Sequence, residues 1–222
     1  MGTGSLRIDG RRFPPPTPRR FLTLGAALAL VLAITPLAAQ IPGNVDWSVR
    51  PGGEGVVFAG EAARGLNYDS GESLFAGVRI ASLQERSAVW FGGGYAGMAG
   101  AADNAVSLGG GLSYVLASPT GMTLAADGGV GIGRRSGSWD WVVPAGLTLW
   151  IDPAPDAAVH PFVSARGFVT GRSGYGEDVG FSAVGGAQVR LPGGPAFHVA
   201  LEWEIADGQK PLGIGLGMSV GG

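Results

Sequence analysis

Apolar residues recur at every second position through much of the chain. The segment 212–220 reads Leu-Gly-Ile-Gly-Leu-Gly-Met-Ser-Val, with apolar side chains on one parity and glycine or serine on the other. Because successive side chains of a strand point to opposite faces, this period of two indicates a strand with one apolar and one nearly bare face. The segments 106–116 and 122–132 repeat the design. The chain is therefore predicted to be all-β.

Turn-forming clusters divide the chain after residue 53 into ten strand-like segments. Most are ten to thirteen residues long, close to the roughly 9 to 11 that a tilted transmembrane strand needs. We predict an antiparallel up-and-down β-barrel over residues 54–222, with about ten strands, or eight if the first hairpin lies outside the barrel. The predicted strands are 55–64, 73–83, 88–98, 105–117, 122–133, 139–151, 159–170, 179–191, 196–206 and 212–221.

The connections between these segments form two alternating sets. One set is mostly tight and contains proline: 84–87, 118–121, 152–158 and 192–195. The other is on average longer and richer in charge: 65–72, 99–104, 134–138, 171–178 and 207–211. Transmembrane barrels combine short inner turns with longer outer loops. With ten strands, both termini then lie on the short-turn, periplasmic side.

The composition of the bare face indicates which face looks outward. A soluble barrel turns its apolar face inward and covers the other with solvated side chains, whereas a membrane barrel turns the apolar face outward. Here the opposite face is mainly glycine, alanine and serine, which suits a confined lumen better than bulk water. We predict a transmembrane barrel, and a soluble sheet with core aromatic residues is the alternative.

Charged residues are rare within the predicted strands, and in most of them they take the parity opposite to the apolar run. In 196–206, for example, Leu201 and Trp203 share one parity, whereas Glu202 and Glu204 take the other. A basic group on the lipid face at mid-bilayer would cost about 2–4 kcal/mol, which this pattern avoids. The charges within the strands are Glu61, Arg79, Asp127, Asp140, Arg166, Arg190, Glu202 and Glu204.

Two predicted strands depart from the pattern. Segment 159–170 places Phe162 and Phe168 on the parity of Arg166, and segment 139–151 contains Pro144, which removes a ladder hydrogen bond. A bulge near either position would restore the alternation. Four tryptophans near strand ends are predicted to form an aromatic girdle at the membrane interface, with core packing as the alternative: Trp90, Trp139, Trp141 and Trp150.

The N-terminus has the order of a secretory signal. Five arginines lie within residues 1–20, and the uncharged run 21–39 ends in Leu-Ala-Ala. We predict a cleavable signal peptide over residues 1–39 and a periplasmic lead-in without strong structure over residues 40–53. A membrane-spanning helix is the alternative, because 19 residues can just cross a bilayer.

Composition narrows the function classes. Without residues 1–39 the chain keeps 10 basic and 16 acidic groups, a net charge of −6. This charge fits poorly with a protein that binds nucleic acid or an anionic surface. The chain has 42 glycines and no cysteine, so no disulfide framework holds the exported protein together. Its stability must come from a closed hydrogen-bond ladder or a large core.

By this pattern, residues 54–222 resemble the small outer-membrane β-barrel proteins of Gram-negative bacteria, the OmpA and OmpX type. The resemblance implies location in the cell outer membrane, contact with outer-membrane lipid and lipopolysaccharide, and insertion by the barrel-assembly machinery. Such proteins commonly end in an aromatic residue on the last strand. Here the last strand ends Met-Ser-Val-Gly-Gly over residues 218–222, so the terminal aromatic is absent.

Candidate chemistry is sparse. General-base catalysis near neutral pH usually needs histidine, and the exported chain has only His160 and His198. Both lie at strand starts on the short-turn side, whereas family enzymes act near the outer rim, so we expect structural roles for them and no enzymatic activity. The sequence shows no metal-ligand spacing, and its glycine clusters lack the context of a phosphate loop. No cofactor is expected.

The strand charges lead to two hypotheses. The arginines could face the acids along a polar path and set the ion preference of a narrow passive channel, or pair across a closed lumen and fill it. We favour a monomeric barrel with a structural or surface role, with the porin-like channel second and an outer-membrane enzyme or small-ligand binder third. The proposed lumen network is Glu61, Arg79, Asp127, Arg166, Arg190, Glu202 and Glu204.

Overall fold

The chain forms ten strands in a computed structural model that describes residues 49–52, 54–66, 73–98, 104–135, 137–154, 157–174, 176–205 and 212–221. The strands are β1 Gly55–Leu66, β2 Ser73–Leu83, β3 Ser87–Met98, β4 Ala105–Ala117, β5 Met122–Arg135, β6 Ser138–Ile151, β7 Val159–Arg172, β8 Glu177–Arg190, β9 Ala196–Ile205 and β10 Leu212–Gly221. The predicted strands are confirmed, several with longer bounds.

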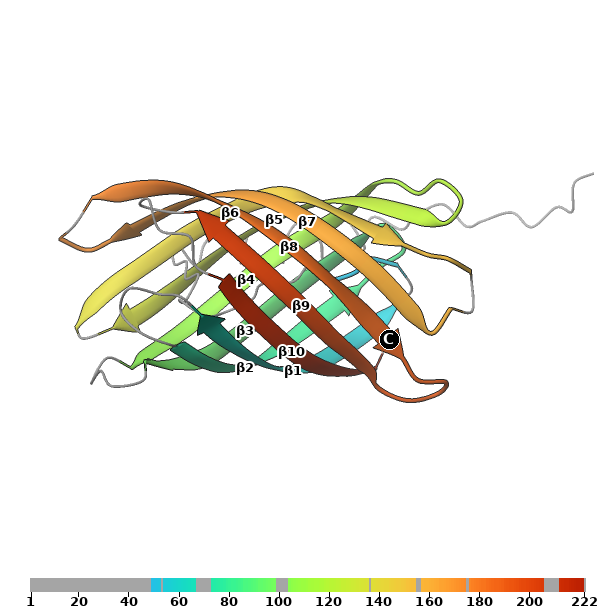
Figure 1. Cartoon of the computed structure of the whole chain (residues 1–222), viewed down its shortest axis with the longest axis horizontal. Helices are drawn as coiled ribbons and strands as arrows, with labels where there is room; N and C mark the ends of the chain where they lie inside the picture. The colour runs from blue at the N-terminus through green and yellow to red at the C-terminus, as the bar shows by residue number, and fades with distance from the viewer. Residues whose placement is uncertain are drawn as a thin grey trace, which may run out of the picture. The chain divides into compact units, whose positions relative to one another are not determined.

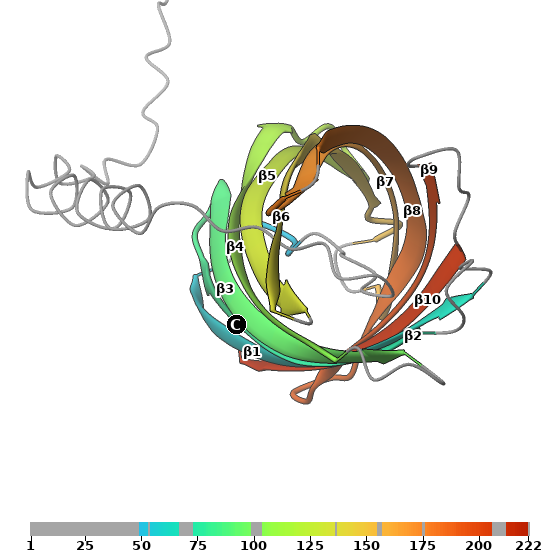
Figure 2. The ribbon, with the colours of Figure 1, turned by 90° about the vertical axis from the view of Figure 1, so that its left-hand side faces the viewer.

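The strands close into one antiparallel barrel. Each strand pairs with its neighbours in sequence, and β1 pairs with β10 from Val57 opposite Gly221 to Leu66 opposite Leu212. The strands run diagonally past one another (Figure 1) and form a ring when viewed from one end (Figure 2). The first hairpin is part of this ring, so the barrel has ten strands and the eight-strand alternative is wrong. Within the described residues, no helix is long and apolar enough to cross a membrane.

The outer face of the barrel is apolar all the way round. Soluble monomers rarely expose contiguous apolar patches larger than a few hundred Å², so a continuous apolar belt is built to face lipid. Two charged side chains outside the lumen, Arg64 and Arg134, lie within the last three residues of their strands, away from the middle of this belt. Every strand contributes exposed large side chains, among them Phe58, Val78, Phe91, Leu108, Val130, Leu147, Val163, Phe181, Leu201 and Leu216.

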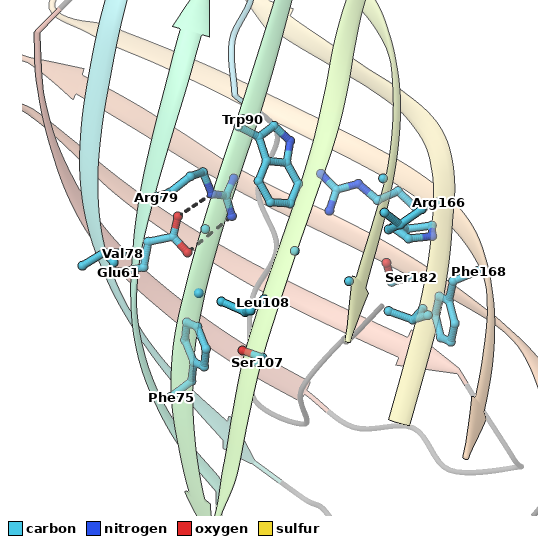
Figure 3. Close-up of a pocket in the computed structure, with 18 of the residues that line it drawn as sticks. Glu61, Phe75, Val78, Arg79, Trp90, Ser107, Leu108, Arg166, Phe168 and Ser182 are labelled. Carbon is cyan, nitrogen blue, oxygen red and sulfur yellow. Dashed lines mark hydrogen bonds and ion pairs between the residues drawn. The ribbon is translucent and has the colours of Figure 1, made fainter. Parts of the chain in front are cut away.

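The lumen contains aromatic side chains as well as small ones. Trp150 and Phe162 are buried, and their ring centroids lie 4.6 Å apart. Trp90 also faces the lumen (Figure 3). The girdle prediction is therefore wrong for Trp90 and Trp150, whereas Trp139 has the exposed position expected of it.

Inward aromatic rings rest on glycines of neighbouring strands. A methyl group placed on Gly94 of β3 or Gly180 of β8 would collide with the ring of Phe75 or Phe168, respectively. A methyl on Gly111 of β4 would lie 2.7 Å from Trp90. Since a Cβ needs more room than this, the glycine-rich face provides the space in which these rings lie.

The structure also resolves the two departures from alternation. β7 pairs with β6 and β8 without a register shift, so the bulge predicted near Phe162 and Phe168 is absent and both rings simply point inward. Around Pro144 the pairing of β6 with β5 is interrupted between Gly128 and Gly131, but the register is the same on both sides. The missing N–H of proline removes ladder hydrogen bonds locally without displacing the strand.

The predicted difference between short and long connections is not present. Connections at the end of the barrel where β1 begins, which we call the terminal end, are three to seven residues long, and those at the far end are two to six. At the far end β5, β7 and β8 extend into the segments predicted as loops. Asp140 and Arg172 pair there on adjacent strands at 2.5 Å, which supports the longer hairpins.

The predicted signal peptide, its alternative as a membrane-spanning helix, and residues 40–48 and 53 of the lead-in lie outside the described residues. Residues 49–52 of the lead-in form no strand, but a backbone hydrogen bond ties them to the barrel. Gly52 donates its backbone N–H to the carbonyl oxygen of Gln84 at 3.2 Å. This short segment therefore lies against the terminal end of the barrel.

Candidate functional site: the lumen and its terminal vestibule

The middle of the lumen is organised around a buried ion pair. Arg79 of β2 contacts Glu61 of β1 with Nε–Oε1 and Nη2–Oε2 distances of 2.8 and 3.3 Å, and both side chains are 5% exposed. The Arg79 guanidinium also lies over the ring of Trp90, 4.3 Å from its centroid (Figure 3). β1 and β2 are adjacent and place both residues on the inward parity. The fork of two contacts and the aromatic face hold the guanidinium in one position.

Asp127 of β5 is held by hydroxyl groups instead of an arginine. Ser113 and Thr148, on the strands either side, donate to its two carboxylate oxygens at 2.5 Å each. Thr148 also lies 3.0 Å from Ser164 of β7, so a polar chain crosses four strands of the wall. Hydrogen bonds to a carboxylate compensate for its removal from water.

Arg166 of β7 and Glu202 of β9 line the same mid-lumen cavity as the Glu61–Arg79 pair, and each is 5% exposed. Arg166 is directed toward this cavity in Figure 3. The cavity measures about 60 Å³. A second space of about 20 Å³ lies between Trp90, Asp127 and Arg166. The middle of the barrel is therefore largely filled by its own side chains.

The terminal end is open by comparison. Two cavities lie there, of about 650 and 760 Å³, and both are bordered by Arg50, Gly52, Arg190 and Leu191. We call the two together the terminal vestibule. Arg79 lines both the first of them and the mid-lumen cavity, so its side chain separates the two regions.

Arg50 crosses the terminal vestibule and joins the lead-in to the barrel. Its Nη2 lies 2.6 Å from Oδ1 of Asp152, and its Nη1 lies 3.1 Å from Nδ1 of His160. Asp152 also contacts His160 at 2.9 Å and accepts a hydrogen bond from Thr123 at 3.2 Å. Burial lowers the pKa of Arg50, Asp152 raises it, and the nearby positive charge of Arg190 lowers it again.

The structure brings part of the predicted charge network together. Glu61 and Arg79 are paired, and Arg166 and Glu202 share their cavity. Arg190 lies apart, exposed in the terminal vestibule, where it donates to Gln188 at 3.4 Å. Glu204 also stands apart from the mid-lumen cavity, half-buried one residue before the far end of β9.

The histidines lie at the terminal ends of their strands, as the sequence predicts. His160 is 5% exposed and belongs to the Arg50–Asp152 cluster. Nε2 of His198 lies 3.0 Å from Oγ of Ser219 on the neighbouring β10, and both line the first vestibule cavity. No group of three or more His, Asp or Glu side chains in the described part of the chain is placed to hold a metal ion.

Sequence reasoning missed Arg50 and Asp152. Both lie outside the strands, in the lead-in and in the connection between β6 and β7, where alternation gives no information on direction. The contact between Arg50 and His160 spans 110 residues of sequence. The sequence offers one signal for this contact: the lead-in and the connection 152–158 are both predicted at the same end of the barrel, and Arg50 and Asp152 carry opposite charges.

No family model and no curated protein matches the chain. Among solved structures, the beta domain of the Bordetella autotransporter BrkA is similar with 12% identity and a TM-score of 0.49, covering 75% of this chain and 98% of that one. The N-terminal barrel of Pseudomonas aeruginosa OprF has 12% identity, a TM-score of 0.37 and coverages of 77% and 99%. A designed transmembrane β-barrel has 19% identity, a TM-score of 0.35 and coverages of 78% and 100%. The assignment of a closed barrel rests on the strand pairing of the chain itself.

Proposed function

We propose that the chain is an outer-membrane barrel whose closed lumen gives it a structural or surface role. The observation that carries this proposal is the filling of the mid-lumen. Glu61, Arg79 and Trp90 are joined by two contacts and a stacked ring, and the cavity beside them measures about 60 Å³. This filling supports a lumen that is closed to hydrated ions.

The apolar outer belt supports contact with outer-membrane lipid and lipopolysaccharide, with the barrel-assembly machinery as the inserting partner. We propose a monomer, because a ten-stranded ring completes its own hydrogen bonding. Cell fractionation tests the location. The chain is expected in the outer-membrane fraction, and recovery of the full chain as a soluble protein without detergent would contradict it.

Conductance in planar lipid bilayers tests the closed lumen. The parent protein is expected to give no stable current steps. The double variant Glu61→Ala/Arg79→Ala removes both charges of the pair and should produce small steps, whereas Arg134→Ala, on the outer face, should behave like the parent. Regular current steps from the parent protein would overturn the proposal of a closed lumen.

A narrow passive channel is the second candidate. It is favoured by the position of Arg79, which among the described residues is the one whose side chain borders both the mid-lumen cavity and the open terminal vestibule. If this candidate is correct, the parent conducts, and Glu202→Gln changes its ion preference because Glu202 lines the cavity.

The proposal includes no catalysis. The absence of catalysis is best tested at His198 and Ser219, because a histidine beside a serine is the pair that hydrolases use to activate a nucleophile. We expect the parent and Ser219→Ala to hydrolyse chromogenic esters at the same background rate. A parent activity that Ser219→Ala abolishes would establish an enzyme.

A further inference from the structure

The terminal vestibule gathers positive charge on an open cavity. Its first cavity, of about 650 Å³, is lined by Arg50, Arg79 and Arg190 from three separate elements. Neither Asp nor Glu is present among the described residues that line it. Pockets of roughly 300–1,000 Å³ are typical of small-ligand sites. The cavity therefore has the size of a binding site and one sign of charge.

The three arginines differ in how far their charge is already compensated. Arg79 contacts Glu61, and Arg50 contacts Asp152. Arg190 contacts the amide oxygen of Gln188 and forms no ion pair with the described residues. Its guanidinium is exposed to the cavity and has donors available for another partner.

Like charges in this vestibule act on one another. Arg190 is close enough to Arg50 for its charge to lower the pKa of that guanidinium. An anion between them would relieve this repulsion and receive charge-assisted hydrogen bonds from both. The neutral side chains of Gln188 and Ser219 line the same cavity and add uncharged hydrogen-bonding groups.

We propose that the first cavity of the terminal vestibule binds a small phosphate-bearing anion, with Arg190 and Arg50 as its cationic contacts. The planar fork of a guanidinium matches the oxygens of a phosphate in a bidentate arrangement, and a dianion suits two arginines better than a single charge does. Arg79 closes the inner side of the site. The vestibule lies inside the ring at the barrel end, which favours a water-soluble ligand over a lipid headgroup.

Isothermal titration calorimetry of the full-length protein in a non-ionic detergent, with inorganic phosphate as the probe, tests this site. Sodium chloride keeps the ionic strength constant throughout. The parent should bind one phosphate per chain. Arg190→Gln and Arg50→Gln should each weaken binding by about tenfold or more, the loss of one charge-assisted hydrogen bond. Arg190→Lys keeps the charge but not the fork, and should fall between the parent and Arg190→Gln.

Arg86→Gln is the matched control. Arg86 lies at the same end of the barrel but outside the vestibule, where it packs over Tyr114 and donates to the carbonyl oxygen of Val115. Its replacement changes the net charge equally and should leave phosphate binding unchanged. Absence of saturable binding by the parent, or equal weakening by Arg86→Gln and Arg190→Gln, would overturn the proposal. The titration does not depend on conductance, so its outcome is separate from that of the closed-lumen proposal.

Discussion

The mid-lumen and the terminal vestibule place arginines on the same inward face but use them differently. In the mid-lumen, Arg79 is 5% exposed, paired with Glu61 and stacked on Trp90, and the cavity that it lines measures about 60 Å³. In the vestibule, Arg190 is exposed beside a cavity of about 650 Å³ and forms no ion pair with the described residues. Inward direction alone therefore does not define the role of a charge. Compensation and packing determine whether it closes the lumen or remains available to a ligand.

The largest effect is expected from breaking the mid-lumen pair. Glu61→Ala removes the carboxylate that Arg79 contacts and leaves the guanidinium in a site shielded from water, which should lower the free energy of unfolding by about 3–5 kcal/mol. Urea unfolding in lipid vesicles, followed by tryptophan fluorescence, measures the change. The double variant Glu61→Ala/Arg79→Ala should recover part of the loss. A double variant as unstable as the sum of the two single variants would show that the two charges do not interact.

A smaller effect is expected from filling the glycine face of the mid-lumen. Gly94→Ala places a methyl group against the ring of Phe75 and should cost about 1–3 kcal/mol of unfolding free energy. Gly60→Ala, on the outward face of β1, is the control, because a Cβ there meets nothing within 4 Å. The same unfolding measurement compares them. Equal destabilisation by the two substitutions would mean that contact with the ring is not the cause.

The smallest effect on stability is expected in the vestibule. Arg190→Gln removes an exposed charge that lies near Arg50, so the free energy of unfolding should change by no more than about 0.5 kcal/mol. Any gain from reduced repulsion should shrink as salt concentration rises, because exposed charges are screened. Comparing the unfolding midpoints at low and high salt checks both points. If Arg190→Gln lowered the free energy of unfolding as much as Glu61→Ala does, the vestibule arginine would be as important for stability as the mid-lumen pair, and the comparison would fail.

Much of the barrel could be predicted from the sequence, because the alternation of apolar and small residues along a strand shows which side chains point outward and which point inward. The strands, their outward apolar faces and the inward positions of Glu61, Arg79 and Glu202 all follow from parity. The girdle prediction was wrong for Trp150 because nearness to a strand end says nothing about which face carries the ring. The predicted difference in loop length was wrong because the sequence does not show how far paired strands continue into a charged hairpin, as β7 does to Arg172.

The sequence by itself determined the positions of the strands, the lipid-facing side chains and the supply of charges for the lumen, since these depend on a period of two that each strand carries alone. Whether the first hairpin joins the barrel was decided by the tertiary structure. The tertiary structure decided which charges meet. Closure of β1 on β10 completes the ring, and the terminal end brings Arg50 to His160 across 110 residues of sequence. Side chains on the same face can pair, stack or stand apart, because the registers and tilts of all ten strands together set the distances between them.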